Sequence, residues 1–182
     1  MRVRRPEDKK MRMPSQERFC KLGARSWMVA VLGAAVALAP AIQAQVLAPA
    51  PSSKHIYSET AKPSADIAAA LAKAKREHKR VLLDFGGDWC GDCQVLDIYF
   101  HQAPNADLLA KHFVLVHVWI GHMDANLDVT KKYGVPINKG VPALAVLSPD
   151  GKVVFAQQAG EFEDMRHMNA QSVTDFLNKW KS

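Results

Sequence analysis

Apolar residues in the second two thirds of the chain follow periods that alternate between helix and strand. In residues 64–78, three apolar positions share one helical face behind Ser64, which has the character of an N-cap, so we expect a helix there. The apolar run 81–85 suits a buried strand, and two glycines follow it. The same reasoning predicts a helix after Cys90 as far as Phe100, a helix over 104–111, a strand over 113–120, a helix over 124–133, strands over 143–147 and 152–156, and a helix over 170–181.

The order of these elements predicts the fold class. A strand, a helix and a strand in succession imply a parallel pair of strands. The turn sequence Ser148-Pro-Asp-Gly151 joins the last two strands into a hairpin, which is antiparallel. We therefore expect an α/β domain over residues 64–182, with one central mixed sheet of about four strands flanked by helices.

The first 44 residues have the pattern of an export signal. They hold nine basic and three acidic residues, and the apolar run 27–39 is followed by small residues up to Ala44. This pattern predicts a signal peptide cleaved after Ala44 and a periplasmic protein, with alternative start residues at Met11, Met13 and Met28. A permanent membrane anchor is the alternative, but about 20 apolar residues are needed to span a bilayer. Residues 45–63, rich in Pro, Ala and Ser, are expected to form a flexible linker.

Charge outside the leader argues against nucleic acid as a partner. The whole chain has a net charge of +6, and the residues after position 44 contain 15 basic and 15 acidic side chains. Because this part of the chain has no net charge, it lacks the basic surface that binding to nucleic-acid phosphates requires.

The cysteines narrow the chemistry to redox exchange or metal binding. Cys20 lies in the predicted signal peptide, so the mature chain would keep only Cys90 and Cys93. A disulfide between two residues so close in sequence closes too short a loop to stabilise a fold appreciably. A structural zinc site needs four protein ligands, and no second Cys-x-x-C or nearby His pair supplies them. Two His-Met pairs are conceivable copper ligands, although chance surface residues explain them better, and no metal site is predicted: His122-Met123 and His167-Met168.

The position of the two cysteines predicts their roles in exchange. Cys90 stands at the start of a predicted helix, where unpaired N–H groups and the positive end of the helix dipole stabilise a thiolate. Cys93 lies one turn inward and is shielded. We therefore expect Cys90 to attack a disulfide and Cys93 to resolve the mixed disulfide. Asp84, on the preceding strand, is either an outward-facing carboxylate or part of the site.

The segment from Asp84 to Cys93, Asp-Phe-Gly-Gly-Asp-Trp-Cys-Gly-Asp-Cys, resembles the strand, loop and helix motif of the thioredoxin family around Trp-Cys-Gly-Pro-Cys. A second family feature, an X-Pro before the third strand, is present as Val141-Pro142. The resemblance, to an exported bacterial member, covers residues 64–182. It implies that Asp84 is buried below the resolving cysteine and passes a proton through water. It also implies that Pro142 is cis, that the Val141 backbone pairs with a substrate strand and that Trp89 flanks the site.

The motif departs from the family pattern in its charges. Asp92 replaces the usual proline, and Gly86 stands where an aromatic residue is common. With Asp88 also close, we expect an exposed negative charge, partly screened by solvent, to disfavour the Cys90 thiolate. This favours a reducing or intermediate potential, tuned by Asp92.

These observations predict an enzyme that exchanges thiols and disulfides with protein substrates, as a reductase or isomerase. It needs no bound cofactor, is expected to be a monomer, and would take electrons from a membrane thiol donor. The alternative is a binding module without turnover, such as a copper or cytochrome-assembly helper. Asp84 and Pro142 distinguish the enzyme from the binding module, because catalysis uses both residues, whereas a module that only holds a partner cysteine does not require them.

Overall fold

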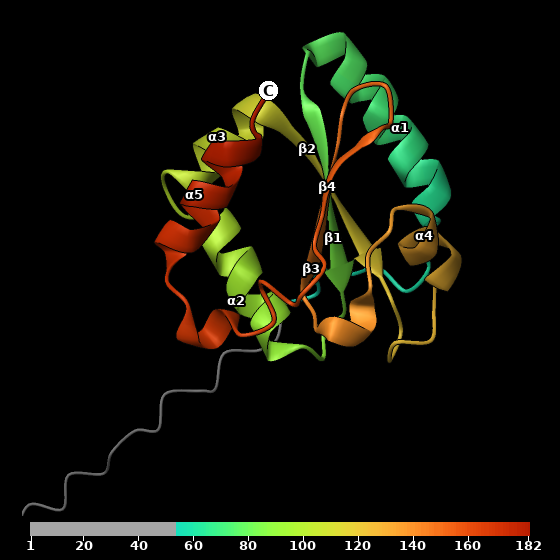
Figure 1. Ribbon diagram of the computed structural model, residues 1–182, viewed down its shortest axis with the longest axis vertical. Helices are drawn as coiled ribbons and strands as arrows, with labels where there is room; N and C mark the ends of the chain where they lie inside the picture. The colour runs from blue at the N-terminus through green and yellow to red at the C-terminus, as the bar shows by residue number, and fades with distance from the viewer. Residues whose placement is uncertain (1–53) are drawn as a thin grey trace, which may run out of the picture. The chain divides into compact units, whose positions relative to one another are not determined.

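A computed structural model describes residues 54–182 of the chain (Figure 1). The predicted leader over residues 1–44, with Cys20, lies outside the described residues, as does the first part of the predicted linker, residues 45–53. Among residues 54–182, no helix combines the length and the apolar character that crossing a bilayer requires.

The described residues form a four-stranded sheet with helices on both faces. In chain order the elements are α1 (Pro63–Glu77), β1 (Arg80–Gly86), α2 (Gly91–Phe100), α3 (Asn105–His112), β2 (Phe113–Trp119), α4 (Leu127–Lys132), the 3-10 turn η1 (Ile137–Lys139), β3 (Ala143–Leu147), β4 (Val153–Ala156), the 3-10 turn η2 (Met165–His167) and α5 (Ala170–Trp180). The strand order is β2-β1-β3-β4, with β1 parallel to β2 and antiparallel to β3, and β3 antiparallel to β4. The predicted mixed sheet flanked by helices is confirmed.

The alternation of side chains along β1 divides the core into two layers. Leu83 and Phe85 face the layer that contains α1 and α4, while Leu82 faces the layer of α2, α3 and α5. Figure 1 shows these two groups of helices on opposite sides of the sheet. Because β1 is central, its residues after Arg80 are all buried, and the loop that leaves its end at Gly86 starts from a rigid position.

Three helices start at different residues from those predicted, and of these α3 differs by one residue only, since it begins at Asn105 and not at Pro104. Helix α1 begins at Pro63, and Lys62 before it makes no side-chain cap. The prediction that Ser64 caps this helix is wrong, because a proline suits the first helical position, where its fixed φ fits and no N–H is needed. Helix α4 is shorter than the predicted range 124–133, since Asn126 has a left-handed φ of 54°.

The described part of the predicted linker packs on the domain. Residues 54–57, which we call the N-terminal strap, are hydrogen-bonded to α2 and to the loop before it. Tyr57 in this strap is only 1% exposed. The prediction of a flexible linker is therefore wrong for this segment, because composition alone gives no indication that one aromatic side chain is buried.

We expect the core position of Leu177 on α5 to be visible in stability. Leu177 has no exposed surface, so Leu177→Ala should lower the free energy of unfolding by about 2–5 kcal/mol through lost burial and a residual cavity. The matched control, Leu127→Ala on α4, removes a side chain that is 47% exposed and should change stability by no more than about 0.5 kcal/mol. Urea denaturation followed by circular dichroism measures both, and equal losses would contradict this placement of the core.

Candidate active site

The two cysteines lie where strand β1 ends and helix α2 begins. Cys90 is the N-cap residue of α2, and its Sγ accepts a hydrogen bond from the backbone N–H of Cys93 at 3.1 Å. The two sulfurs form a disulfide. Cys90 keeps 6% of its surface exposed, whereas Cys93 keeps none. After reduction, a thiolate at Cys90 would therefore face the unpaired N–H groups of the helix start, which stabilise negative charge.

The loop before β3 brings a backbone carbonyl to the dithiol. The carbonyl oxygen of Val141 lies 3.6 Å from Cys90 Sγ, and the peptide bond between Val141 and Pro142 is cis. Gln157 is buried and holds this loop. Its side-chain amide donates to the Pro142 carbonyl at 3.3 Å, and its side-chain oxygen accepts from the N–H of Leu144 at 3.2 Å. Gln157 was not predicted, because a glutamine directly after a strand has no distinctive sequence pattern.

Trp89 presents an apolar surface directly before Cys90. Its side chain is 46% exposed, yet its indole N–H donates to the carbonyl of Gly121 at 2.7 Å. The ring also stacks on His122, with 5.5 Å between the ring centroids. These two contacts fix the exposed ring beside the dithiol.

The His-Met pairs considered as copper ligands make other contacts. His122 stacks on Trp89, and His167 pairs with Asp164. Within residues 54–182, no group of three or more His, Cys, Asp and Glu side chains is placed to hold a metal ion. Neither pair is therefore part of such a cluster in the described segment.

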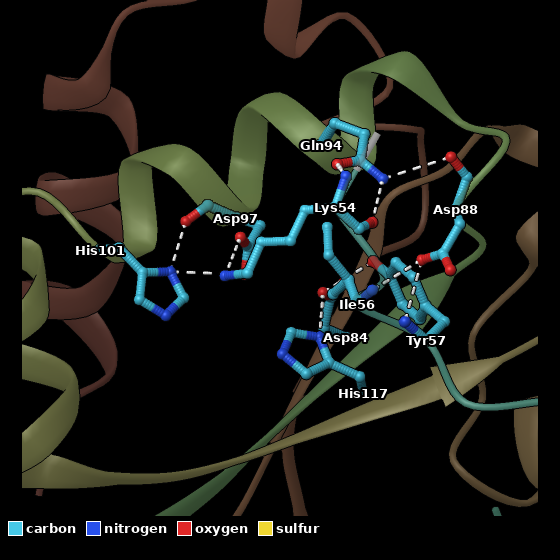
Figure 2. Close-up of polar contacts among 9 residues, drawn as sticks. All are labelled: Lys54, Ile56, Tyr57, Asp84, Asp88, Gln94, Asp97, His101 and His117. Atoms are coloured by element: carbon cyan, nitrogen blue, oxygen red, sulfur yellow. Dashed lines mark hydrogen bonds and ion pairs between the residues drawn. The ribbon is translucent and has the colours of Figure 1, made fainter. Parts of the chain in front are cut away.

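Asp84 lies on the central strand with no solvent exposure, so its interpretation as an outward-facing carboxylate is wrong. Its Oδ2 accepts a hydrogen bond from the Tyr57 hydroxyl at 2.8 Å (Figure 2). The same oxygen lies 2.9 Å from Nδ1 of His117, the residue directly opposite on β2. Oδ1 has no hydrogen-bond partner among the residues that the structure describes. The carboxylate thus has one oxygen fixed by two contacts and one oxygen available to accept a proton.

Tyr57 reaches this site from the N-terminal strap. A Cβ atom placed on Gly86 would lie 2.6 Å from the Tyr57 hydroxyl oxygen and 2.8 Å from Cys93 Sγ. The tyrosine therefore fills the space beside Gly86, the position where thioredoxin sequences commonly have an aromatic residue. Tyr57 was not predicted as a site residue. The available signal was the missing aromatic at Gly86 together with a single tyrosine in the segment expected to be a linker.

The two partners of Asp84 have perturbed acidities. Burial, and then the charge of Asp84, raise the pKa of Tyr57 well above its usual value, so its hydroxyl remains a donor. Burial alone would lower the pKa of His117, but the hydrogen bond and the charge of Asp84 outweigh it and raise that pKa. Because a carboxylate can only accept, the proton on His117 belongs on the Nδ1 that faces Asp84.

Asp88 fastens the strap to the loop before the dithiol. Its Oδ1 accepts hydrogen bonds from the backbone N–H groups of Ile56 and Tyr57 at 2.8 and 3.0 Å (Figure 2). Its Oδ2 contacts Nδ1 of His55. Burial raises the pKa of Asp88, but these hydrogen bonds outweigh it and leave the pKa lowered. The charge of Asp88 is therefore balanced by donors on the strap.

Asp92, between the cysteines, is buried, which corrects the expectation of an exposed charge beside Cys90. The residue is 7% exposed. Its carboxylate accepts from the backbone N–H of Arg166 at 2.9 Å and from Nε at 3.1 Å, and Nη2 lies 3.0 Å from Oδ2. Burial raises the pKa of Asp92, but the hydrogen bonds from Arg166 outweigh it and lower the pKa. Cys90 thus lies near an ion pair rather than near a free negative charge.

Comparison with known proteins agrees with this geometry. A family model described as "Thioredoxin-like" matches residues 62–149. The crystal structure of a disulphide isomerase from Xylella fastidiosa Temecula1 is 40% identical with a TM-score of 0.67, covering 70% of this chain and 98% of that chain. Among curated proteins, the thiol:disulfide interchange protein DsbD of Pseudomonas fluorescens is 26% identical over 69% of this chain, and DsbD 2 of Pseudomonas aeruginosa is 30% identical over 56%. The matches cover only 20% and 17% of those two proteins.

The chain belongs to the thioredoxin-like family, as its sheet, its Cys-x-x-C pair and these similarities together establish. Within that family it is a thiol–disulfide oxidoreductase, and the two cysteines of its Cys-x-x-C sequence, Cys90 and Cys93, form a disulfide in the structure. The sequence-based predictions of the family and of this class of enzyme are confirmed.

We expect Asp92 and Arg166 to shift the reduction potential of the dithiol in opposite directions. Arg166→Gln leaves the Asp92 carboxylate uncompensated two positions after Cys90, which destabilises the thiolate and makes the pair more reducing. Asp92→Asn leaves the Arg166 charge uncompensated and makes the pair more oxidising. Equilibration with glutathione buffers measures each potential.

The double variant Asp92→Asn, Arg166→Gln is the control for this pair. It removes both charges and should return close to the wild-type potential. If all four proteins had the same potential, the ion pair would have no influence on Cys90.

Proposed function

We propose that the protein is an exported periplasmic enzyme that exchanges thiols and disulfides with protein substrates. The observation that carries this proposal is the position of Cys90. It is the one residue of the pair with exposed surface, it caps α2, and its Sγ lies 3.6 Å from the carbonyl oxygen of Val141. A thiolate stabilised by a helix terminus, beside a backbone carbonyl on a neighbouring loop, is suited to attack a disulfide in an extended chain.

The proposed reaction has two steps. The Cys90 thiolate attacks one sulfur of the substrate disulfide, and the other substrate sulfur leaves and takes up a proton. Cys93 then loses its proton and attacks Cys90 Sγ, which breaks the mixed disulfide and releases the second substrate sulfur. The substrate gains two electrons, and the pair is oxidised to the Cys90–Cys93 disulfide. We assign the acceptance of the Cys93 proton to Asp84, which is buried and has one oxygen without a partner in residues 54–182.

Three residues beside Cys90 are proposed to bind the substrate. Trp89 offers an exposed ring held by its contacts to Gly121 and His122. Val141 and Pro142 offer a backbone segment that Gln157 holds in place from within the core. An extended substrate chain can pair with such a segment through its own backbone.

The proposed direction of electron flow is toward the substrate, as in a reductase or isomerase. The residues between the cysteines are Gly91 and Asp92, so no histidine adds positive charge there. Because Asp92 is paired with Arg166, its charge contributes less to this direction than the sequence suggests. The similarity to a structure described as a disulphide isomerase supports the proposal. The oxidised pair must be reduced again for each turnover, and we propose a membrane thiol protein as the electron donor.

A binding module that holds a partner cysteine without turnover is the alternative. The buried carboxylate of Asp84 supports turnover, because a protein that only holds its partner needs no proton acceptor. The measurement that separates the two is the number of substrate disulfides reduced per molecule of protein.

We expect the two cysteine variants to fail at different steps. Cys90→Ser should abolish the reduction of insulin disulfides, because the attacking sulfur is lost. Cys93→Ser should accumulate a mixed disulfide with the substrate, visible by non-reducing electrophoresis and mass spectrometry. In the reduced wild type, iodoacetamide at pH 7 should modify Cys90 before Cys93, and the opposite order would overturn the assignment.

Export is tested separately on the full chain expressed in a Gram-negative host. The N-terminus of the mature protein, read by mass spectrometry, should be Gln45 or within a few residues of it, with the protein in the periplasmic fraction. Recovery of the uncleaved chain from membranes would instead indicate a permanent anchor.

A further inference from the structure

The N-terminal strap contacts the dithiol region through both its backbone and its side chains. The backbone N–H of Lys54 donates to Gln94 Oε1 at 3.1 Å, and Gln94 Nε2 donates to the Lys54 carbonyl at 2.9 Å and to that of Asp88 at 3.2 Å. Lys54 Nζ also pairs with Asp97 at 2.8 Å. Figure 2 shows this network running along α2 and into the loop before Cys90. The strap is thereby fixed at several points, and Tyr57 is held at its inner end.

Tyr57 contacts the carboxylate of Asp84 and shares a small space with the sulfur of Cys93. Its hydroxyl donates to Asp84 Oδ2 at 2.8 Å. The hydroxyl oxygen and Cys93 Sγ also face the same small space, since both lie within 3 Å of the Cβ position on Gly86. Neither the family motif nor the proposed reaction uses this residue.

We propose that Tyr57 is a positioning residue for the second step of exchange. This inference rests on the proposed function. By donating to Oδ2, the Tyr57 hydroxyl and His117 hold that oxygen and leave Oδ1 of Asp84 as the proton acceptor.

The step balances in protons and electrons. The Cys93 S–H bond breaks and its proton goes to Asp84 Oδ1, while a bond forms between Cys93 and Cys90 Sγ. The bond between Cys90 and the substrate sulfur breaks, and the substrate leaves as a thiolate. Tyr57 keeps its own proton throughout, consistent with the raised pKa of its buried hydroxyl.

Other charged groups face this cluster and stay constant in the test. They are Asp88 from the loop before Cys90, Asp97 from α2 and Lys54 from the strap. His117, from β2, contacts Asp84 directly. Because a change of Tyr57 to phenylalanine leaves all four groups in place, any altered pH dependence comes from the lost hydroxyl.

The test compares Tyr57→Phe with Tyr99→Phe in the mature chain from residue 45. Phenylalanine keeps the ring that fills the space beside Gly86. Tyr99 is the matched control, because its hydroxyl makes one hydrogen bond, to the Met168 carbonyl at 3.1 Å. Each reduced protein is mixed with 5,5′-dithiobis(2-nitrobenzoate) in a stopped-flow instrument. The first thiolate released reports attack by Cys90, and the second reports resolution by Cys93.

Tyr57→Phe should leave the first phase unchanged and slow the second about tenfold at pH 7, the size expected for one hydrogen bond to a charged group. The difference in second-phase rate between Tyr57→Phe and the wild type should shrink as the pH rises, because hydroxide can then remove the Cys93 proton in place of Asp84. Tyr99→Phe should match the wild type in both phases. An unchanged second phase in Tyr57→Phe, or a slowing that is the same at every pH, would overturn the inference.

The same substitution in an Asp84→Asn background separates positioning from packing. If Tyr57 acts through Asp84, Tyr57→Phe adds no further slowing there, whereas an equal additional slowing would mean that the hydroxyl acts only on packing. Absence of the first phase in the wild type would instead refute the proposed function itself. Thermal unfolding of each variant confirms that the compared proteins are folded.

Discussion

The buried carboxylate of Asp84 is the constraint on which the site depends. A negative charge on a central strand costs several kcal/mol unless hydrogen bonds compensate it. The compensating groups come from His117 on β2 and from Tyr57 on the N-terminal strap, 33 and 27 positions away in the chain. One side chain therefore ties the central strand to its neighbour and to a segment outside the sheet, close to the dithiol.

The other carboxylates around the start of α2 also hold segments in place. Asp88 binds the strap backbone, Asp97 pairs with Lys54, and Asp92 pairs with Arg166 from the turn η2. Each charge is balanced locally, so the helix terminus has a larger share in stabilising a Cys90 thiolate than the sequence alone suggests. Groups that look from sequence like a repulsive cluster are, in the fold, the attachment points of the loops around the site.

Local pattern predicted most of the fold, and long-range contacts explain the rest. The order of helices and strands follows from spacing between near neighbours, and the Cys-x-x-C motif is equally local. Arg166 could not be predicted, because its partner Asp92 lies 74 positions earlier. Tyr57 was missed for a related reason: a segment rich in Pro, Ala and Ser reads as a linker, and only the neighbouring Gly86 leaves room for the ring.

The strap also changes where this domain begins. The family model starts at residue 62, and helix α1 starts at Pro63. A fragment cut at either boundary would contain every helix and strand found in residues 54–182, together with Cys90 and Cys93. It would nevertheless leave Asp84 with a single donor and open a hole beside Gly86. Within residues 54–182, the piece that carries the whole site therefore includes the strap upstream of α1.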